Sequence, residues 1–166
     1  KQIKKFNQGI DPTLSQLADK KTNIYTGAAA DPSSKNKRSL KIRTTKKKEA
    51  GANFIQTQMV MDRHHLITFC EEISRPLEIP VIAGVFLLKS YKNALFINKY
   101  VPGANIPEHI LNRLKYANDP LKEGILIAAE QAEDFINIAE GIHIMAVKAE
   151  HLVPEILSIS GLNLEY

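Results

Sequence analysis

Short apolar runs alternate along the chain with longer segments whose apolar residues have helical spacing. The short runs predict four strands, at residues 23–29, 54–59, 81–87 and 143–147. The longer segments predict helices at residues 35–50, 64–73, 91–98, 108–115, 121–139 and 149–159. Five apolar residues of the segment 121–139 should face a sheet: Ile125, Ala128, Ala132, Phe135 and Ile138. Strands that alternate with helices are typical of βα units around a parallel sheet.

Turn residues separate these segments and fix the number of units. Ser33 and Ser34 can cap the helix that follows the first strand, and Gly51 is expected to end it. Residues 1–22 are too few and too polar for more than a helix end and a turn. The count is four βα units, whereas a TIM-type (β/α)₈ barrel has eight strands and typically about 250 residues. The predicted class is therefore α/β, with residues 1–166 as a single domain that resembles half of such a barrel.

Composition indicates a soluble globular domain. The chain has 166 residues, of which 44% are hydrophobic and 24% charged. Its longest apolar run, residues 79–88, is interrupted by Pro80 and is far shorter than the roughly 20 residues of a membrane helix. Residues 1–6 carry charges where a secretory signal would be apolar, and Cys70 is the single cysteine. We therefore expect no membrane partner, no intramolecular disulfide and a cytoplasmic location.

The formal charge of +4 comes largely from one segment. Residues 35–48 contain eight cations and no acid: Lys35, Lys37, Arg38, Lys41, Arg43, Lys46, Lys47 and Lys48. One basic helix suits a single anionic ligand, although a solvated helix face would show the same pattern. A nucleic-acid partner is not expected, because the segment has no interleaved aromatic residues and the chain has no RNA- or DNA-binding motif.

Polar residues stand at the end of the second predicted strand. Thr57 and Gln58 follow Phe54 and Ile55, and parallel strands present ligand-facing groups at their carboxyl ends. This strand therefore predicts a binding site. His64 and His65 are adjacent and point in different directions on a helix, so no metal site is predicted.

Four blocks of this sequence, taken together, resemble the methylenetetrahydrofolate reductase family. They are Thr-Gly-Ala-Ala-Ala-Asp-Pro (26–32), Glu-Ala-Gly-Ala-Asn-Phe-Ile-Gln-Thr-Gln (49–58), Ile-Pro-Val-Ile-Ala-Gly-Val (79–85) and Gly-Ile-His-Ile-Met (141–145). Their order and spacing match the family over most of residues 23–162. The second block is the most specific.

The resemblance implies an enzyme built as a flavin-containing TIM barrel. Its FAD would take a hydride from NAD(P)H or another reduced donor and pass it to 5,10-methylenetetrahydrofolate, giving 5-methyltetrahydrofolate for one-carbon and methionine metabolism. The cofactor carries this chemistry and the protein positions it.

Positions in the blocks also imply site residues. The cofactor-binding positions implied by the resemblance are Asp31, Arg43, Lys46, Lys47 and Ala52. The three cations suit the FAD diphosphate, but Asp31 stands where some relatives place a histidine, and a carboxylate cannot replace a cation.

The implied folate contacts are Gln58, Asn93 and Met145. The amide of Gln58 can both donate to and accept from a pterin edge. Met145 stands where some relatives have an aromatic residue, and packing in the barrel core would also explain it. His143, between Ile142 and Ile144, is expected to face a packed layer with a backbone partner.

No catalytic residue is assigned, because the family's acidic glutamate belongs to the half of the barrel that this chain lacks. We expect the chain to be part of a longer polypeptide, given that it begins with Lys1 instead of Met. A second subunit or a second copy would complete the barrel equally well. The alternative function is a non-catalytic half-barrel that binds folate or serves assembly.

Overall fold

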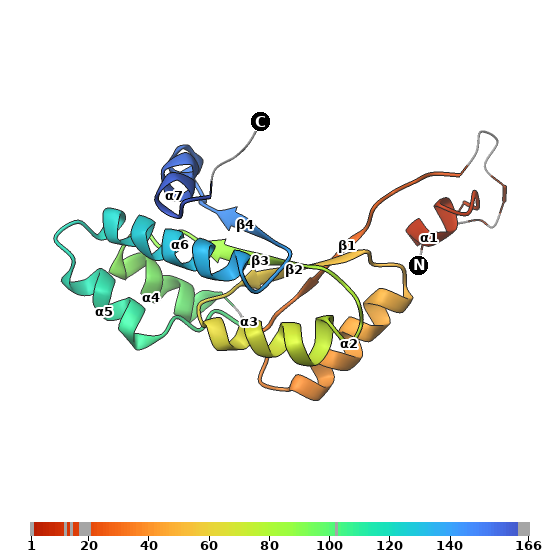
Figure 1. Cartoon of the computed structure of the whole chain (residues 1–166), viewed down its shortest axis with the longest axis horizontal. Coiled ribbons are helices and arrows are strands. Elements are labelled where there is room, and N and C mark those ends of the chain that lie inside the picture. Colours follow the sequence, from red (N-terminus) through yellow and green to blue (C-terminus); the bar gives the residue numbers. More distant parts are fainter. Residues whose placement is uncertain (1, 12, 14, 17–20, 102, 163–166) are drawn as a thin grey trace.

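A four-stranded parallel sheet forms the centre of the computed structural model, which describes residues 2–11, 13, 15–16, 21–101 and 103–162. The strands lie side by side in chain order (Figure 1): β1 (Gly27–Ala30), β2 (Phe54–Met59), β3 (Val81–Phe86) and β4 (Gly141–Met145). Every pairing is parallel, so the carboxyl ends of the strands meet at one edge. The predicted α/β class and its parallel sheet are confirmed.

Helices fill the connections between these strands. The α-helices are α1 (Gln2–Phe6), α2 (Lys37–Glu49), α3 (Arg63–Phe69), α4 (Tyr91–Tyr100), α5 (Glu108–Tyr116), α6 (Pro120–Ile136) and α7 (Val153–Ile159). Asn36, Ser90 and Asp119 each accept a hydrogen bond from a backbone N–H in the first turn of α2, α4 and α6, respectively. A 3₁₀ turn at Glu150–Leu152 precedes α7.

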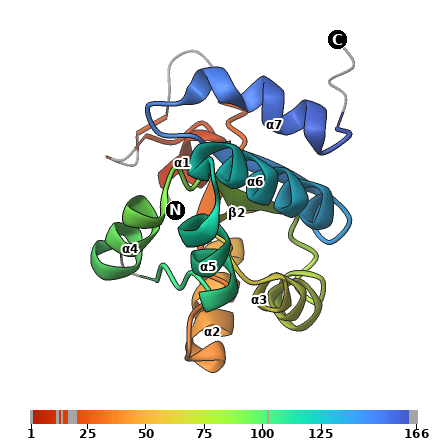
Figure 2. The same ribbon diagram turned by 90° about the vertical axis from the view of Figure 1, so that its left-hand side faces the viewer.

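The main core lies between the helices and one face of the sheet. Helices α2, α3, α6 and α7 contribute buried residues to this core. Figure 2 shows these four helices in an arc, from α7 at the top through α6 and α3 to α2 at the bottom. The residues of β3 that point into this core are Val81, Ala83 and Val85. Four of the five residues of the segment 121–139 that were predicted to face the sheet are buried here, and the fifth, Ile138, packs against them. Gln56 and Gln58 are exposed on the opposite face, which we call the open face of the sheet.

A second, smaller cluster joins α4 and α5 to α6. Its buried members are Met61, Leu88, Ala94, Ile97, Ile106, Ile110, Leu114 and Ile127. Arg113 of α5 crosses to α6, where its Nε lies 2.6 Å from Glu123 Oε1 and its Nη2 lies 2.9 Å from Glu130 Oε1. The hydrogen bonds that Arg113 donates to Glu130 and Glu123 raise the pKa of Arg113 still further, so this cation persists at all ordinary pH values.

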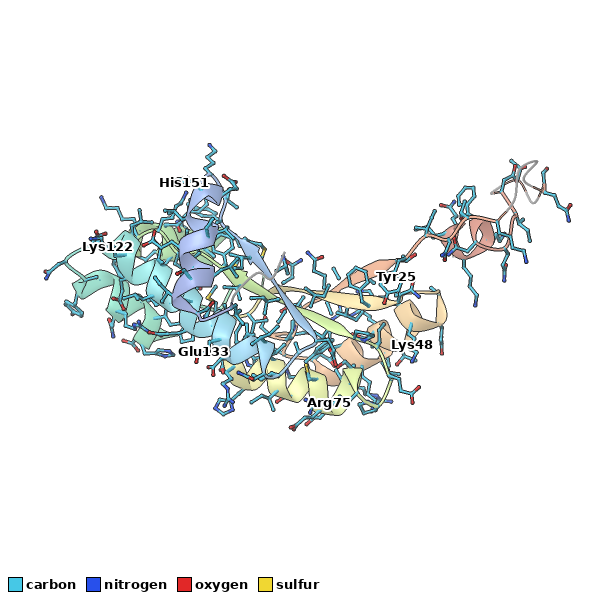
Figure 3. The ribbon with its side chains drawn as sticks, turned by 45° about the horizontal axis from the view of Figure 1, so that its top comes forward. Tyr25, Lys48, Arg75, Lys122, Glu133 and His151 are labelled. Carbon is cyan, nitrogen blue, oxygen red and sulfur yellow. The ribbon has the colours of Figure 1, made fainter. Side chains whose placement is uncertain are left out.

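The first strand is shorter at its start than predicted. It begins at Gly27, which pairs with Phe54, the first residue of β2. Residues 23–26 lie before this first pair, so no residue of β2 stands opposite them. Asn53 holds this segment instead: its N–H donates to Thr26 O at 2.7 Å, and its Oδ1 accepts from Thr26 N–H at 2.9 Å. Tyr25, labelled in Figure 3, stays 70% exposed. Its ring stacks on that of Phe54 with 5.6 Å between ring centroids.

Several other boundaries differ from the predicted ones. The segment predicted as a helix at residues 64–73 is helical throughout, but the α-helix ends at Phe69 and continues as a π-helical turn, Cys70–Ser74, in which Arg75 N–H donates to Cys70 O. Helix α6 ends at Ile136, three residues early, with Asn137 as its cap. Strand β4 begins at Gly141 instead of His143, because its pairing with β3 starts at Ile82. Among the described residues, no helix combines the length and apolar character needed to cross a membrane.

Candidate binding site on the open face of the sheet

A β-bulge near the end of β2 shapes the candidate site. Ile55 pairs with Val81 and Gln56 with Ile82, but Met59, not Gln58, pairs with Gly84. The Thr57 hydroxyl accepts the Gly84 N–H at 2.8 Å and donates to Gln58 O at 2.7 Å. One extra residue is therefore accommodated in β2, and a side chain replaces a main-chain partner. Bulges of this kind redirect side chains and are common beside active sites.

The bulge requires a glycine on the neighbouring strand. A Cβ atom at Gly84 would lie 2.7 Å from Gln58 O and 3.0 Å from the Gln58 carbonyl carbon. Both contacts are to main-chain atoms, which cannot turn aside as a side chain can. Gly84 is thus part of the structure that presents Gln58 at the end of β2.

The first pocket beside Gln58, which we call the sheet pocket, lies on the open face and has a volume of about 380 Å³. Its lining comes from three strands: Gly27, Ala28, Ala29, Phe54, Gln56, Thr57, Gln58, His143 and Met145. Two of the three predicted folate contacts, Gln58 and Met145, meet here. The pocket combines an aromatic ring, a thioether and four polar side chains, a composition suited to an organic ligand with hydrogen-bonding edges.

The second pocket, which we call the basic pocket, has a volume of about 240 Å³ and lies between the end of β1 and helix α2. It is lined by Ala29, Ala30, Asp31, Leu40, Arg43, Lys47 and Gln58. Three predicted cofactor residues meet here, and the two pockets share Ala29 and Gln58. Two cations above small residues at a strand end can bind an anionic group.

The charged groups of the basic pocket have local partners. Lys47 Nζ donates to Ala29 O, which holds this ammonium group at the carboxyl end of β1. Arg43 Nη2 lies 3.5 Å from Ser34 Oγ. Asp31 Oδ1 accepts from the Ser33 N–H at 2.9 Å and from the Ser33 hydroxyl at 2.6 Å. Asp31 therefore shapes the loop after β1 through its hydrogen bonds with Ser33. This role does not require a cationic residue at position 31.

Three other predicted site residues lie outside both pockets. Lys46 lines a separate hollow between α1 and α2. Ala52 lies at the amino end of β2, where its N–H donates to Lys47 O at 3.0 Å. Asn93 lies in the first turn of α4, and its Oδ1 accepts from Lys89 N–H at 3.2 Å. The ligand contacts of all three remain predictions.

Sequence reasoning missed the larger side chains of Phe54, Gln56 and His143 among the residues that line the sheet pocket. His143 was expected to face a packed layer, but it lies on the open face beside Gln56. Residues two apart on a strand lie on the same face, so His143 shares its side of β4 with Met145. Met145 was already predicted to face a ligand, and the same could have been predicted for His143. The expected backbone partner does exist, and it is Thr57 O.

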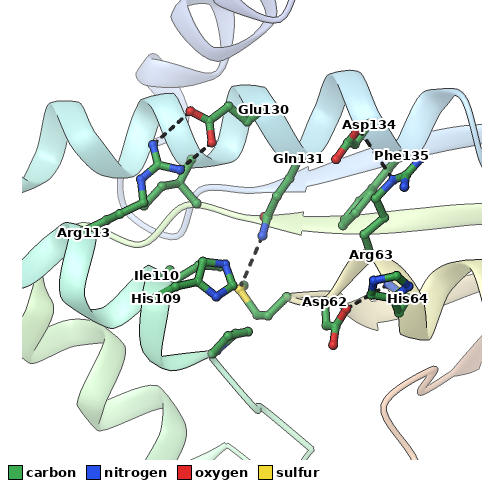
Figure 4. Close-up of a pocket in the computed structure, with 13 residues that line it drawn as sticks. Asp62, Arg63, His64, His109, Ile110, Arg113, Glu130, Gln131, Asp134 and Phe135 are labelled. Carbon is green, nitrogen blue, oxygen red and sulfur yellow. Dashed lines mark hydrogen bonds and ion pairs between the residues drawn. The ribbon is translucent and has the colours of Figure 1, made fainter.

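A larger cavity of about 430 Å³ lies in the helix layer between the start of α3, α5 and α6 (Figure 4). None of the predicted site residues lines it. Its rim carries the Arg113–Glu130 pair and a weaker Arg63–Asp134 pair at 3.7 Å. The Nε2 of buried Gln131 lies 3.8 Å from Met61 Sδ, while its Oε1 has no hydrogen-bond partner among the described residues.

These features define an α/β protein with adjoining pockets at the carboxyl ends of parallel strands. The chain belongs to the methylenetetrahydrofolate reductase family, whose model matches residues 18–161. One relative is methylenetetrahydrofolate reductase 2 of Saccharomyces cerevisiae, which is 32% identical over 77 residues. That match covers 45% of this chain and 12% of the yeast protein.

A solved structure shares the fold. It is an uncharacterized protein from Clostridium thermocellum that binds two copies of 5-methyl-5,6,7,8-tetrahydrofolic acid. The TM-score is 0.63 at 17% sequence identity, and the match covers 82% of this chain and 52% of the other. The chain thus spans about half the length of that protein and a smaller part of the yeast reductase.

Proposed function

We propose that this chain forms one wall of the folate and flavin site of a methylenetetrahydrofolate reductase. The observation that carries the proposal is the position of Gln58, which lines both pockets at the end of β2. Family membership supports the reaction, the reduction of 5,10-methylenetetrahydrofolate to 5-methyltetrahydrofolate with electrons from NAD(P)H or another reduced donor. The solved relative that binds 5-methyltetrahydrofolic acid supports folate as the ligand class.

In this proposal the sheet pocket receives the folate. The Gln58 amide would donate to and accept from the pterin edge, and Met145 would pack against the benzoyl ring. Gln58 is exposed and its amide has no hydrogen-bond partner among the described residues, so it is available to a ligand. Asn93 stands farther along the same end of the sheet, at the start of α4, and would approach the substrate from that side.

The residues of the basic pocket fit the phosphate-bearing part of FAD. Arg43 and Lys47 supply two positive charges, and Ala29 and Ala30 leave room for a close approach. Lys46, one position from Lys47, would contribute at longer range. When bound, the flavin would accept and donate the hydride. The protein residues would bind its anionic part and hold the folate beside it.

The open face and the two edge strands support a half-barrel. Among the described residues, β1 and β4 each pair on one side, and the open face carries the sheet pocket. Four further strands would close a (β/α)₈ barrel around this face and form the opposite wall of the site. These strands would come from more of the same polypeptide, from a second subunit or from another copy of the chain.

Titration calorimetry of the chain with 5-methyltetrahydrofolate tests the folate proposal. Replacing Gln58 by Leu keeps the size of the side chain but removes its hydrogen bonds, so binding should weaken about tenfold or more. Gln8→Leu makes the same chemical change on an exposed residue outside both pockets and should bind as the native chain does. Absence of binding to the native chain, or equal binding to both variants, would contradict the proposal.

A binding-only role is the second candidate, and one observation favours it. Asp31 is the sole carboxylate that lines either pocket in the described part of the chain, and it accepts a hydrogen bond from the Ser33 hydroxyl. The two candidates differ in a flavin assay. Reoxidation of protein-bound reduced FAD by 5,10-methylenetetrahydrofolate would establish the reductase, whereas folate binding without flavin uptake or reoxidation would establish the binding role.

A further inference from the structure

An imidazole ring links the two strands that flank β3. His143 of β4 pairs with Gly84 of β3. Its ring reaches past Gly84 to β2, where Nε2 lies 3.2 Å from Thr57 O and Nδ1 lies 3.4 Å from Gln56 Nε2. A Cβ atom on Gly84 would lie 3.1 Å from His143 Nε2. The glycine therefore makes room for this link as well as for the bulge.

The partners of the ring define its proton positions. A carbonyl oxygen such as Thr57 O only accepts, so His143 Nε2 must carry a hydrogen. The amide nitrogen of Gln56 only donates, so Nδ1 must offer its lone pair. The arrangement selects the neutral Nε2–H tautomer with both ring nitrogens bonded.

Thr57 O, the acceptor of the His143 hydrogen bond, lacks the donor that a regular parallel sheet would give it. Ile55 N–H donates to Pro80 O at 2.8 Å, so a regular parallel ladder would continue with Gly84 N–H donating to Thr57 O. In the bulge, Gly84 N–H turns to the Thr57 hydroxyl instead. His143 Nε2–H occupies the position that the ladder would have filled. The imidazole thus satisfies the carbonyl that the bulge released.

We propose that His143 is a positioning residue that maintains the Thr57–Gln58 bulge and thereby keeps Gln58 at the ligand site. The role of Gln58 rests on the proposed function, whereas the bond to the bulge rests on the structure. Without the imidazole, Thr57 O regains Gly84 N–H as its nearest donor and the strand relaxes toward the regular ladder. Gln58 would then pair with Gly84 in place of Met59. That shift is one residue, roughly 3.3 Å along the strand.

Nitrogen-15 NMR of the full chain tests the link directly. The ring nitrogens of His143 should show the Nε2–H tautomer, with Nδ1 unprotonated. In His143→Phe, which keeps a flat ring but removes both bonds, the Gly84 amide and Gln58 side-chain signals should move. His143→Gln can still donate to Thr57 O and should restore most of these shifts. His109→Phe, a change at an exposed helix residue, should leave them in place.

Titration with 5-methyltetrahydrofolate then measures the effect on the ligand site. Binding should weaken about tenfold in His143→Phe and return to within about threefold of the native value in His143→Gln. A Gln58 signal and an affinity that are both unchanged in a folded His143→Phe variant would overturn the proposal, as would an Nδ1–H tautomer in the native chain. If the native chain binds no folate, the proposed function fails, and the tautomer and the bulge signals still decide whether His143 holds the bulge.

Discussion

Replacement of Gly84 by Ala tests the close packing at the bulge. The new methyl group would lie 2.7 Å from Gln58 O, a distance that Cβ atoms in real proteins essentially never show. It would also lie 3.0 Å from the Gln58 carbonyl carbon, which is rare. Gly84 does not have a positive φ angle, so the backbone itself would accept Ala. We therefore expect steric crowding, and not backbone strain, to lower the stability of this variant.

The expected magnitude follows from overpacking of a buried site. Forcing an extra carbon into a close-packed interior typically costs about 1–3 kcal/mol in the free energy of unfolding. For a chain of this length each kcal/mol lowers the melting temperature by about 2–4 °C. Thermal unfolding followed by circular dichroism should therefore show a decrease of a few degrees or more.

Gly141→Ala is the matched control for this experiment. Gly141 lies on the adjacent strand β4, also without a positive φ angle, and its added Cβ would meet only Ile82 Cγ1 at 4.0 Å. This variant should be neutral or slightly stabilising, because Ala restricts the unfolded chain more than Gly does. Equal melting temperatures for the two variants would refute the steric argument.

Three further predictions concern the helix layer. Gly124→Ala should lower the free energy of unfolding by about 3 kcal/mol, as measured by urea unfolding, because its Cβ would lie 1.8 Å from Leu88 O. This steric effect should outweigh the better helix propensity of Ala. Gln131→Leu should be neutral or stabilise by about 1 kcal/mol in the same assay, since it removes a buried carbonyl without a donor; a loss above about 2 kcal/mol would contradict this. Burial raises the pKa of the Cys70 thiol, so labelling by a thiol reagent should be slow until denaturant is added. The folded state resists forming this thiolate, so stability should fall as pH rises above the ordinary thiol range, and a rise there would contradict the burial argument.

The fold was largely predictable because the strands carry local signals. β2 has the predicted bounds, since Gly51 and the polar end of the strand delimit it. The start of β1 was not predictable, because Ile24 and Tyr25 are good strand residues and only the register with Phe54 leaves them unpaired. The π-helical turn after Phe69 depends on a shift in hydrogen bonding that leaves the apolar pattern almost unchanged.

The candidate site was predictable where a residue acts through its type and position. Gln58, Met145, Arg43 and Lys47, which the family resemblance implied, line the two pockets, and their ligand contacts stay predictions. The bulge was not predictable, because it consists of a pairing offset between two strands. The contact of His143 with Thr57 depends on that offset and on the missing side chain of Gly84, so it could be found only in three dimensions.

The chain-order arrangement of the sheet has a consequence for folding. In the part of the chain that the structure describes, each strand pairs only with the strands before and after it, so the sheet can grow one unit at a time, as in repeat proteins. The connection between β3 and β4, residues 87–140, is more than twice as long as that between β1 and β2, residues 31–53. Each doubling of a loop adds roughly 0.6 kcal/mol of closure entropy. β4, with His143, is therefore expected to join last, and the bulge on β2 to be secured in the final folding step.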